Sequence, residues 1–216
     1  MAYRSVIFDL DGTLSDSSEG IMKGVRYAME RFGVTDIPEA TLRRFIGPPL
    51  YDTFSQIFGL TSEQADHAVA LYREYYLPKG MYENRLYPGI KELLGRLKEA
   101  GVALYICTSK PQMVTDRVLA YLGVAEAFQG VIGASMDRSL NDKTSLLRLL
   151  LRERQPNRPA VMVGDTRFDL EAAAACGLEA IAVRWGFGLE DELARAGWQA
   201  ETPQALGDYL LKEMKA

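Results

Sequence analysis

Short apolar runs that alternate with helical patterns are the feature of this sequence that most constrains its fold. Four such runs, rich in β-branched residues, lie at positions 5–8, 102–107, 160–163 and 180–183. A fifth and weaker run lies at 130–133. Short runs of this kind are typical of parallel strands whose two faces are both covered. We therefore expect a mainly parallel sheet.

Segments with helical spacing of apolar residues lie between these runs. Apolar residues recur at helical spacing at 90–97 and at 114–122. Each pattern is followed by a glycine, Gly101 or Gly123, as is common where a helix ends. Alternating strands and helices predict an α/β chain with a doubly wound, Rossmann-like parallel sheet.

The alternation is interrupted by a long stretch in the N-terminal half, where every apolar pattern has helical spacing. Thr61 and Gln64 are placed to form a capping box at the start of one of these helices. Ser, Asp, Pro and Gly residues gather at both borders, as in hinge segments. We predict an α/β core formed by residues 1–16 and 84–216, with an all-helical cap domain at 17–83.

Composition argues against several classes of partner. The chain has 25 Lys and Arg against 29 Asp and Glu, a formal net charge of −4 and a pI near 5.2. This balance disfavours binding of nucleic acid polymers or anionic membranes by bulk charge. No apolar stretch of about 18 uncharged residues occurs, so a membrane span is not expected. The two cysteines, Cys107 and Cys176, are expected to be reduced core residues of a cytoplasmic protein.

Several familiar types of site are also excluded. His67 is the only histidine, which leaves almost nothing from which to build a Ser-His-Asp triad or a multi-histidine zinc site. The sequence contains neither a GxxxxGK phosphate loop nor a GxGxxG motif after a strand. Nothing in these patterns fixes an oligomeric state.

Polar side chains follow three of the apolar runs, and a lysine stands where a later helix should begin. These residues are Asp9 and Asp11, then Thr108, Ser109 and Lys110, then Asp165 and Asp169, and the lysine is Lys143. Taken singly, each has an ordinary explanation as a helix cap, a turn residue or a solvated lysine. In open α/β sheets, however, ligands bind at the carboxyl ends of the strands, where these groups would meet. Converging carboxylates repel one another unless a cation is held between them, and Mg2+ suits carboxylates with water and a phosphate.

Four segments of the chain resemble the motifs of a known superfamily. FDLDGTLSDS, CTSKP, the lone Lys143 and VGDTRFDLEAAAACG look like the four motifs of the haloacid dehalogenase superfamily of phosphohydrolases, in the expected order. The helical insertion resembles the helical cap of that superfamily. The resemblance implies a Mg2+-dependent phosphomonoesterase that acts through an aspartyl-phosphate on small phosphate monoesters.

The first motif carries the covalent chemistry. Asp9 can attack phosphorus, which splits one difficult displacement into two easier ones. Asp11 lies two residues on, and alternate residues of an extended segment face the same way. It can protonate the leaving oxygen as a general acid and then activate water as a general base.

The remaining motifs supply groups for the phosphate. The Lys143 ammonium, the Thr108 hydroxyl and the Ser109 backbone N–H are expected to hold the transferred phosphoryl group. Lys110 is expected to face solvent at the start of a helix. Thr144 stands where many relatives have proline, a departure that concerns the local backbone more than the lysine before it.

The metal ligands follow from the resemblance. It implies that Mg2+ is bound by the Asp9 carboxylate, the Asp11 backbone carbonyl and the Asp165 carboxylate. Asp169, one helical turn after Asp165, is expected to orient Lys143 or a metal-bound water.

Substrate choice is expected to depend on the cap, because the core motifs recognise only a phosphate. The segment FIGPPL contains a Gly-Pro-Pro turn at the place where relatives have a specificity loop. The candidate specificity residues are Arg43, Phe45, Gly47 and Tyr76. The alternative is that cap tyrosines pack the cap and cap arginines are solvated.

The strings FIGPPL, LYREYY and ENRLYPGI resemble a subgroup described as phosphoglycolate phosphatase-like or as 5′-nucleotidases. A Gly-Pro-Pro wall with aromatic residues suits a flat base, so we expect a nucleoside 5′-monophosphate such as a pyrimidine or hypoxanthine nucleotide. The alternatives are a phosphoglycolate phosphatase, in which a cap arginine grips the carboxylate, a sugar phosphomutase, and a non-enzymatic phosphate-responsive switch. Closure of the cap is expected to hinge at 16–18 and 84–88.

Overall fold

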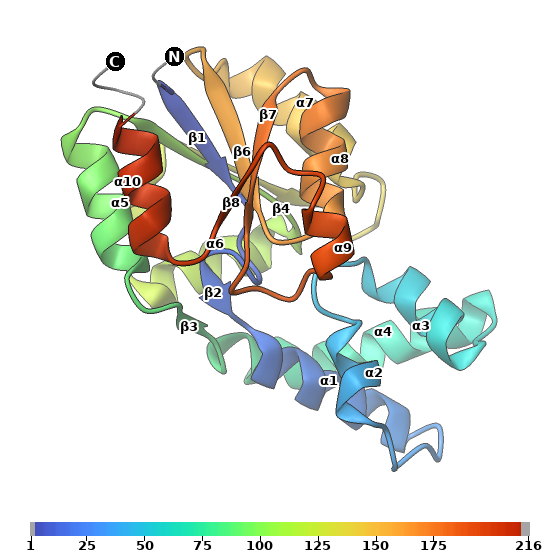
Figure 1. Cartoon of the computed structure of the whole chain (residues 1–216). Coiled ribbons are helices and arrows are strands. Elements are labelled where there is room, and N and C mark those ends of the chain that lie inside the picture. The colour runs from blue at the N-terminus through green and yellow to red at the C-terminus, as the bar shows by residue number, and fades with distance from the viewer. Residues whose placement is uncertain (1–2, 213–216) are drawn as a thin grey trace. The chain divides into compact units, whose positions relative to one another are not determined.

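The computed structural model describes residues 3–212, and the chain divides into two compact units (Figure 1). One unit contains the described residues up to Ser15 and from Leu86 onward, and the other is Asp16–Arg85. Each is described separately below.

The larger unit is built on a six-stranded sheet in which all pairs with a known register are parallel. Its strands, in spatial order, are β5 (Gly130–Ala134), β4 (Ala103–Pro111), β1 (Ser5–Phe8), β6 (Ala160–Gly164), β7 (Glu179–Val183) and β8 (Trp198–Ala200). The chain runs from β1 outward to β4 and β5, then returns to β6 on the other side of β1. This reversal confirms the doubly wound sheet and places its switch point beside β1.

Helices cover both faces of this sheet (Figure 1). Helices α5 and α10 pack against one another, and α7 packs against α8 on the opposite side of the sheet. The helices of this unit are α5 (Ile90–Glu99), α6 (Gln112–Leu122), α7 (Lys143–Arg154), α8 (Arg167–Ala175), α9 (Glu190–Leu193), α10 (Pro203–Lys212) and the 3-10 helix η2 (Ala125–Ala127). All four residues of β1 are buried, as expected of a central strand with both faces covered.

The strand register aligns β1 with its two neighbours, β4 and β6. Ser5 lies beside Ala103 on one side and Ala160 on the other, and Phe8 lies beside Ile106 and Val163. The residues that follow β1 therefore leave the sheet level with those that follow Ile106 in β4 and Val163 in β6.

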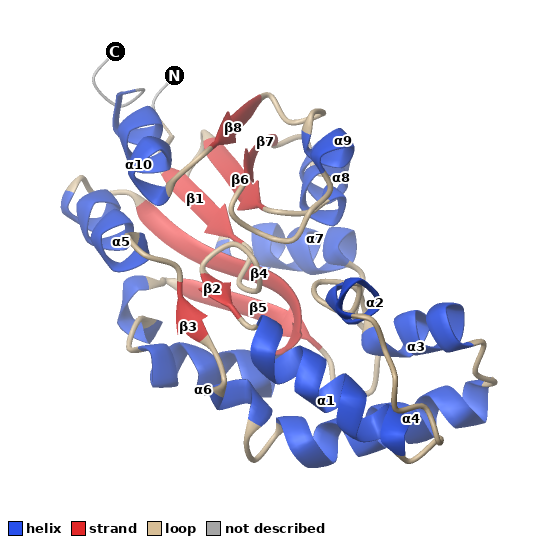
Figure 2. Cartoon of the chain, turned by 60° about the horizontal axis from the view of Figure 1, so that its bottom comes forward, coloured by secondary structure: helices blue, strands red, loops and turns tan. Residues whose placement is uncertain are grey.

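Three strand features differ from the sequence-based expectation. Strand β4 continues to Pro111, with a register shift against β5 between Thr108 and Pro111. Strand β8 has only three residues, one of them a glutamine, so no apolar run marks it. A two-stranded sheet of β2 (Ser15–Asp16) and β3 (Arg85–Leu86) is too short to have a sequence pattern (Figure 2).

The smaller unit is helical, with β2 and β3 contributing only at its ends. Its helices are α1 (Ser18–Glu30), α2 (Glu39–Arg43), α3 (Leu50–Phe58), α4 (Ser62–Tyr76) and the 3-10 helix η1 (Gly80–Tyr82). The predicted capping box is present, because Thr61 Oγ1 accepts the Gln64 N–H and the Gln64 side chain accepts the Thr61 N–H. Among residues 3–212, no helix is long and apolar enough to cross a membrane.

Candidate active site

Asp9 and Lys143 form the centre of a buried polar cluster at the carboxyl edge of the sheet. Asp9 directly follows β1 and is only 4% exposed. Lys143 begins α7, and its Nζ lies 2.7 Å from Asp9 Oδ1 and 2.9 Å from Asp169 Oδ1. It also donates to the Cys107 carbonyl oxygen at 3.2 Å. The lysine is therefore fixed by β4, α8 and the end of β1 together.

Burial sets the electrostatics of this cluster. It raises the pKa of Asp9 to about 6, against the opposing effect of the Lys143 charge. Burial alone would lower the pKa of Lys143, but the carboxylates of Asp169 and Asp9 outweigh it and hold that pKa above its ordinary value. Lys143 therefore stays positively charged beside the Asp9 carboxyl group.

Asp165 is a second buried carboxylate, placed directly after β6. It is fully buried, and both of its oxygens accept hydrogen bonds. Thr13 Oγ1 donates to Oδ1 at 3.0 Å, and the Phe187 backbone N–H donates to Oδ2 at 2.8 Å. Burial, and then the nearby carboxylates of Asp169 and Asp9, raise the pKa of Asp165 well above its ordinary value.

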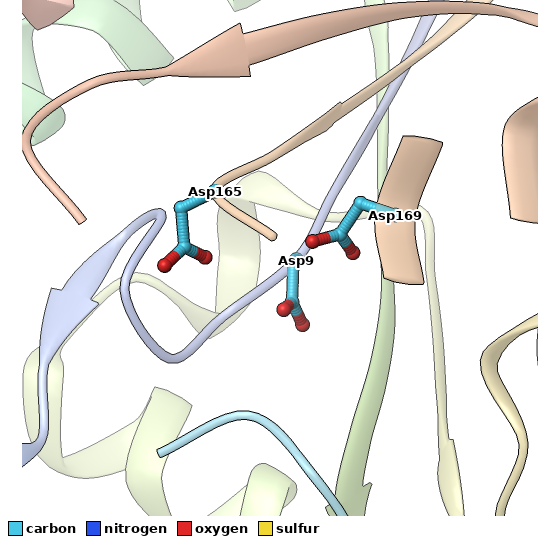
Figure 3. A group of neighbouring side chains, drawn as sticks. All are labelled: Asp9, Asp165 and Asp169. Carbon is cyan, nitrogen blue, oxygen red and sulfur yellow. The ribbon is translucent and has the colours of Figure 1, made fainter. Parts of the chain in front are cut away.

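Three carboxylates offer oxygens close enough for a metal ion. Oxygen atoms of Asp9, Asp165 and Asp169 lie within 4.8 Å of one another (Figure 3). Asp169 is already engaged, because its Oδ1 pairs with Lys143 and its Oδ2 accepts the N–H and hydroxyl of Thr166. All three carboxylates thus remain candidate ligands, and Asp169 also contacts Lys143.

The charge of the site fits a divalent cation. Four buried carboxylates, Asp9, Asp11, Asp165 and Asp169, face two buried ammonium groups. With all six groups ionised the formal charge is −2, and carboxylate oxygens are hard donors, the type that Mg2+ prefers.

Lys110 corrects one sequence-based expectation. It was expected to face solvent, but this is wrong: Lys110 is buried and its Nζ lies 2.6 Å from Asp11 Oδ2. The reason is that β4 continues to Pro111 and α6 begins only at Gln112, so Lys110 belongs to the strand end and not to the helix.

Thr108 and Ser109 lie in β4, just before Lys110. Thr108 is buried, and its Oγ1 accepts the Lys110 N–H at 3.3 Å. Ser109 is half-buried. The end of β4 thus places two hydroxyl side chains and a lysine at the same edge of the sheet as Asp9.

The four candidate specificity residues lie in the helical unit and differ in exposure. Phe45 is buried with its ring 4.8 Å from that of Phe54, and Tyr76 is buried with its ring stacked on Tyr72. Arg43 is exposed and pairs with Glu39 at 2.7 Å. Gly47 has a φ of 101°, which favours glycine. Phe45 and Tyr76 therefore contribute to packing of this unit.

Residues 185–188, Trp-Gly-Phe-Gly, belong to the site but were not predicted from the sequence. Besides the Phe187 contact to Asp165, Trp185 Nε1 donates to the Thr13 carbonyl oxygen at 3.0 Å. The sequence signal that could have identified this segment is a tryptophan followed by two nearby glycines, directly after the apolar run that forms β7. Residues that follow a parallel strand lie at the carboxyl edge of the sheet, where ligands bind.

Comparison with known proteins identifies the family of this chain. A sequence profile described as haloacid dehalogenase-like hydrolase matches residues 6–183. The chain is therefore a member of that family. Phosphatases of this family act on small phosphate esters and generally use Mg2+.

Individual relatives within the family carry different functional names. A 5′-nucleotidase of Pseudomonas aeruginosa is 39% identical over 194 residues, which cover 89% of this chain and 88% of the relative. The tyrosine-protein kinase PtkA of Mycobacterium tuberculosis is 38% identical over 207 residues, which cover 95% of this chain and 70% of the relative. A crystal structure described as a predicted phosphatase from Clostridium acetobutylicum superposes with a TM-score of 0.93 at 35% identity, covering 98% and 100%. A phosphoglycolate phosphatase of Rhodospirillum rubrum is 28% identical over 228 residues, covering 96% and 95%.

Proposed function

We propose that this protein is a Mg2+-dependent phosphomonoesterase that hydrolyses nucleoside 5′-monophosphates through an aspartyl-phosphate on Asp9. The observation that carries the proposal is the pair of buried carboxyl–lysine contacts two residues apart, Asp9 with Lys143 and Asp11 with Lys110. In this proposal Asp9, beside one lysine, acts as the nucleophile, and Asp11, beside the other, acts as the proton carrier.

The first half of the reaction forms the covalent intermediate. A carboxylate oxygen of Asp9 attacks phosphorus, and the bond from phosphorus to the ester oxygen breaks. Protonated Asp11 gives its proton to the departing oxygen, so that the nucleoside leaves as an alcohol. Lys143, Thr108 and the Ser109 N–H are the groups that would bind the phosphoryl oxygens.

The second half returns the enzyme to its starting state. The Asp11 carboxylate takes a proton from water, the water oxygen bonds to phosphorus, and the bond to Asp9 breaks to release inorganic phosphate. Mg2+, held by Asp9, Asp165 and the Asp11 backbone carbonyl, would neutralise charge on the phosphoryl group and lower repulsion toward the nucleophile.

Similarity to the P. aeruginosa 5′-nucleotidase over most of both chains supports a nucleotide substrate. The phosphoglycolate phosphatase of R. rubrum supports the second candidate, 2-phosphoglycolate, at lower identity. The catalytic steps are the same for both, because the core groups act on the phosphate alone.

A panel of substrates tests the proposal. Release of inorganic phosphate is measured with Mg2+ for UMP, IMP, 2-phosphoglycolate and glucose 6-phosphate, with Asp9→Asn and omission of Mg2+ as controls. We expect UMP and IMP to have the highest kcat/KM, and both controls to abolish release. Preference for 2-phosphoglycolate would overturn the nucleotide assignment and keep the mechanism, whereas release that survives in Asp9→Asn would overturn the mechanism.

The relative named as a tyrosine-protein kinase defines a further control. A tyrosine-containing peptide is incubated with ATP, Mg2+ and the enzyme, and phosphotyrosine is measured. We expect none above the Asp9→Asn background, because in the proposed mechanism Asp11 activates water, which then takes the phosphoryl group from Asp9.

A further inference from the structure

Residues 185–188 form a short segment, here called the strap, that follows β7 and precedes α9. Each of its four residues approaches either Asp165 or the loop that follows β1. Trp185 donates its indole N–H to the Thr13 carbonyl oxygen at 3.0 Å. Phe187 donates its backbone N–H to Asp165 Oδ2 at 2.8 Å.

The two glycines of the strap are required by close approach. A Cβ on Gly186 would overlap the Asp165 side chain and crowd the Gly12 carbonyl oxygen, and a Cβ on Gly188 would overlap the Asp165 carbonyl oxygen. Neither glycine has a left-handed backbone conformation, so space and not φ excludes other residues. The strap backbone therefore lies directly on Asp165.

These contacts close a ring. Thr13 donates its hydroxyl to Asp165 Oδ1, Asp165 Oδ2 accepts from Phe187, and Trp185 returns to the carbonyl of Thr13. Gly12, beside Thr13, also approaches Asp165 so closely that a Cβ would overlap its carboxylate. Movement of the first loop or of the strap would consequently displace the Asp165 carboxylate.

We propose that the strap positions the Asp165 carboxylate and the loop from Asp9 to Thr13 as one unit for Mg2+, with Trp185 as its anchoring residue. This inference rests on the proposed function, since it takes Asp165 as a ligand of the metal. Each oxygen of a carboxylate has two acceptor sites, so Asp165 can accept its two hydrogen bonds and still bind a cation. Hydrogen bonds that orient a metal ligand commonly change metal affinity by about 10- to 100-fold when removed.

Trp185 also allows the proposal to be tested without turnover. The chain has two tryptophans, and the other, Trp198, stacks on Tyr209. In Trp198→Phe, Trp185 is the only tryptophan. We expect its fluorescence to change on addition of Mg2+ in the absence of substrate, with the same midpoint as the Kd measured by calorimetry on the wild-type protein.

The decisive variants alter the strap. Trp185→Phe keeps an aromatic ring beside Tyr87, which the indole contacts edge-on, but removes the N–H donor to Thr13. We expect it to raise the calorimetric Kd for Mg2+ about 10-fold, with kcat restored at saturating Mg2+. Gly186→Ala should raise the Kd further, because the new methyl group must displace Asp165. Gly95→Ala is the matched control, since a Cβ there meets open space, and it should leave the Kd unchanged.

The outcomes separate the strap from the proposed function. If the wild-type protein binds no Mg2+, or Asp165→Asn binds it as well as the wild type, the assignment of the metal site is overturned. If the wild type binds Mg2+, Asp165→Asn does not, and Trp185→Phe and Gly186→Ala bind it with wild-type affinity, the strap proposal alone is overturned. If Trp185→Phe does not fold, the Kd of Gly186→Ala decides.

Discussion

Lys110 and Asp11 form a buried ion pair, with the lysine Nζ 2.6 Å from Asp11 Oδ2, although 99 positions separate them in the chain. The two residues meet because β1 and β4 are neighbours in the sheet and their carboxyl ends lie at the same edge. The carboxyl group that we propose as the proton carrier is thus held in one position by a cation.

Replacing Lys110 by Met is expected to destabilise the protein, because it leaves the Asp11 carboxylate buried beside an apolar side chain. Removal of one partner of a buried pair costs about 3 kcal/mol of the free energy of unfolding. The double variant Lys110→Met, Asp11→Asn should regain part of this loss. Urea unfolding measures all three proteins, with Lys91→Met, an exposed lysine of α5, as the control. Equal stability of Lys110→Met and the wild type would show that the pair contributes nothing.

Replacing Asp11 by Asn is expected to trap the phosphorylated enzyme. The amide of the introduced asparagine can neither protonate the leaving oxygen nor take a proton from water, so both half-reactions should slow. Hydrolysis of the Asp9 acyl phosphate that still forms should then become the slow step. Intact mass after acid quench, with the preferred substrate and Mg2+ present, should show one added phosphoryl group, which Asp9→Asn should lack. A phosphoenzyme whose lifetime is the same in Asp11→Asn and the wild type would instead support a phosphate-responsive switch.

The parts of the fold that the sequence predicted are those with continuous local patterns. Ser5–Phe8 was predicted with its observed bounds because a strand buried on both faces is a mostly apolar run in the sequence. Trp198–Ala200 has only three residues and a polar centre, so it has no such run. The general rule that ligands bind at strand ends was enough to single out Asp9 and Asp165. Contacts between distant segments could not be read in this way: Trp185 bonds to Thr13 across 172 positions, and only the path of the chain through space joins them.

Replacing Phe45 by Ala separates two roles for a candidate specificity residue. Because its ring packs against Phe54 and Phe58, we expect a loss of about 3–5 kcal/mol in the free energy of unfolding. Phe45→Leu should recover most of that stability and retain the wild-type KM. Tyr82→Ala, at an exposed site, is the control for stability. Wild-type stability in Phe45→Ala together with a raised KM would assign Phe45 to substrate contact.

The metal-free protein is expected to lose stability as the pH rises from about 5 to 7. Burial raises the pKa of Asp9 from 3.8 to about 6, and the pKa of Asp165 is also raised, so the folded state binds these protons more tightly than the unfolded state. Stability from such groups is fully present below the ordinary pKa and is lost as the pH passes through the folded-state pKa. For Asp9 the full loss, from below pH 3.8 to above pH 6, is about 3 kcal/mol, and somewhat less than half of it falls between pH 5 and 7.

Groups with lowered pKa values do not cancel this trend. Asp16, whose carboxylate accepts from Ser18 and pairs with Arg85, has a pKa below its ordinary value, so its contribution is already complete by about pH 5. Thermal unfolding in EDTA should therefore show a melting temperature that falls between pH 5 and 7. Millimolar Mg2+ should oppose the fall, because the ion binds the deprotonated carboxylates of the folded state and stabilises it increasingly as the pH rises. A melting temperature that rises with pH in EDTA would mean that the buried carboxylates are fully compensated by Lys143 and Lys110 alone, and the need for a cation at this site would disappear.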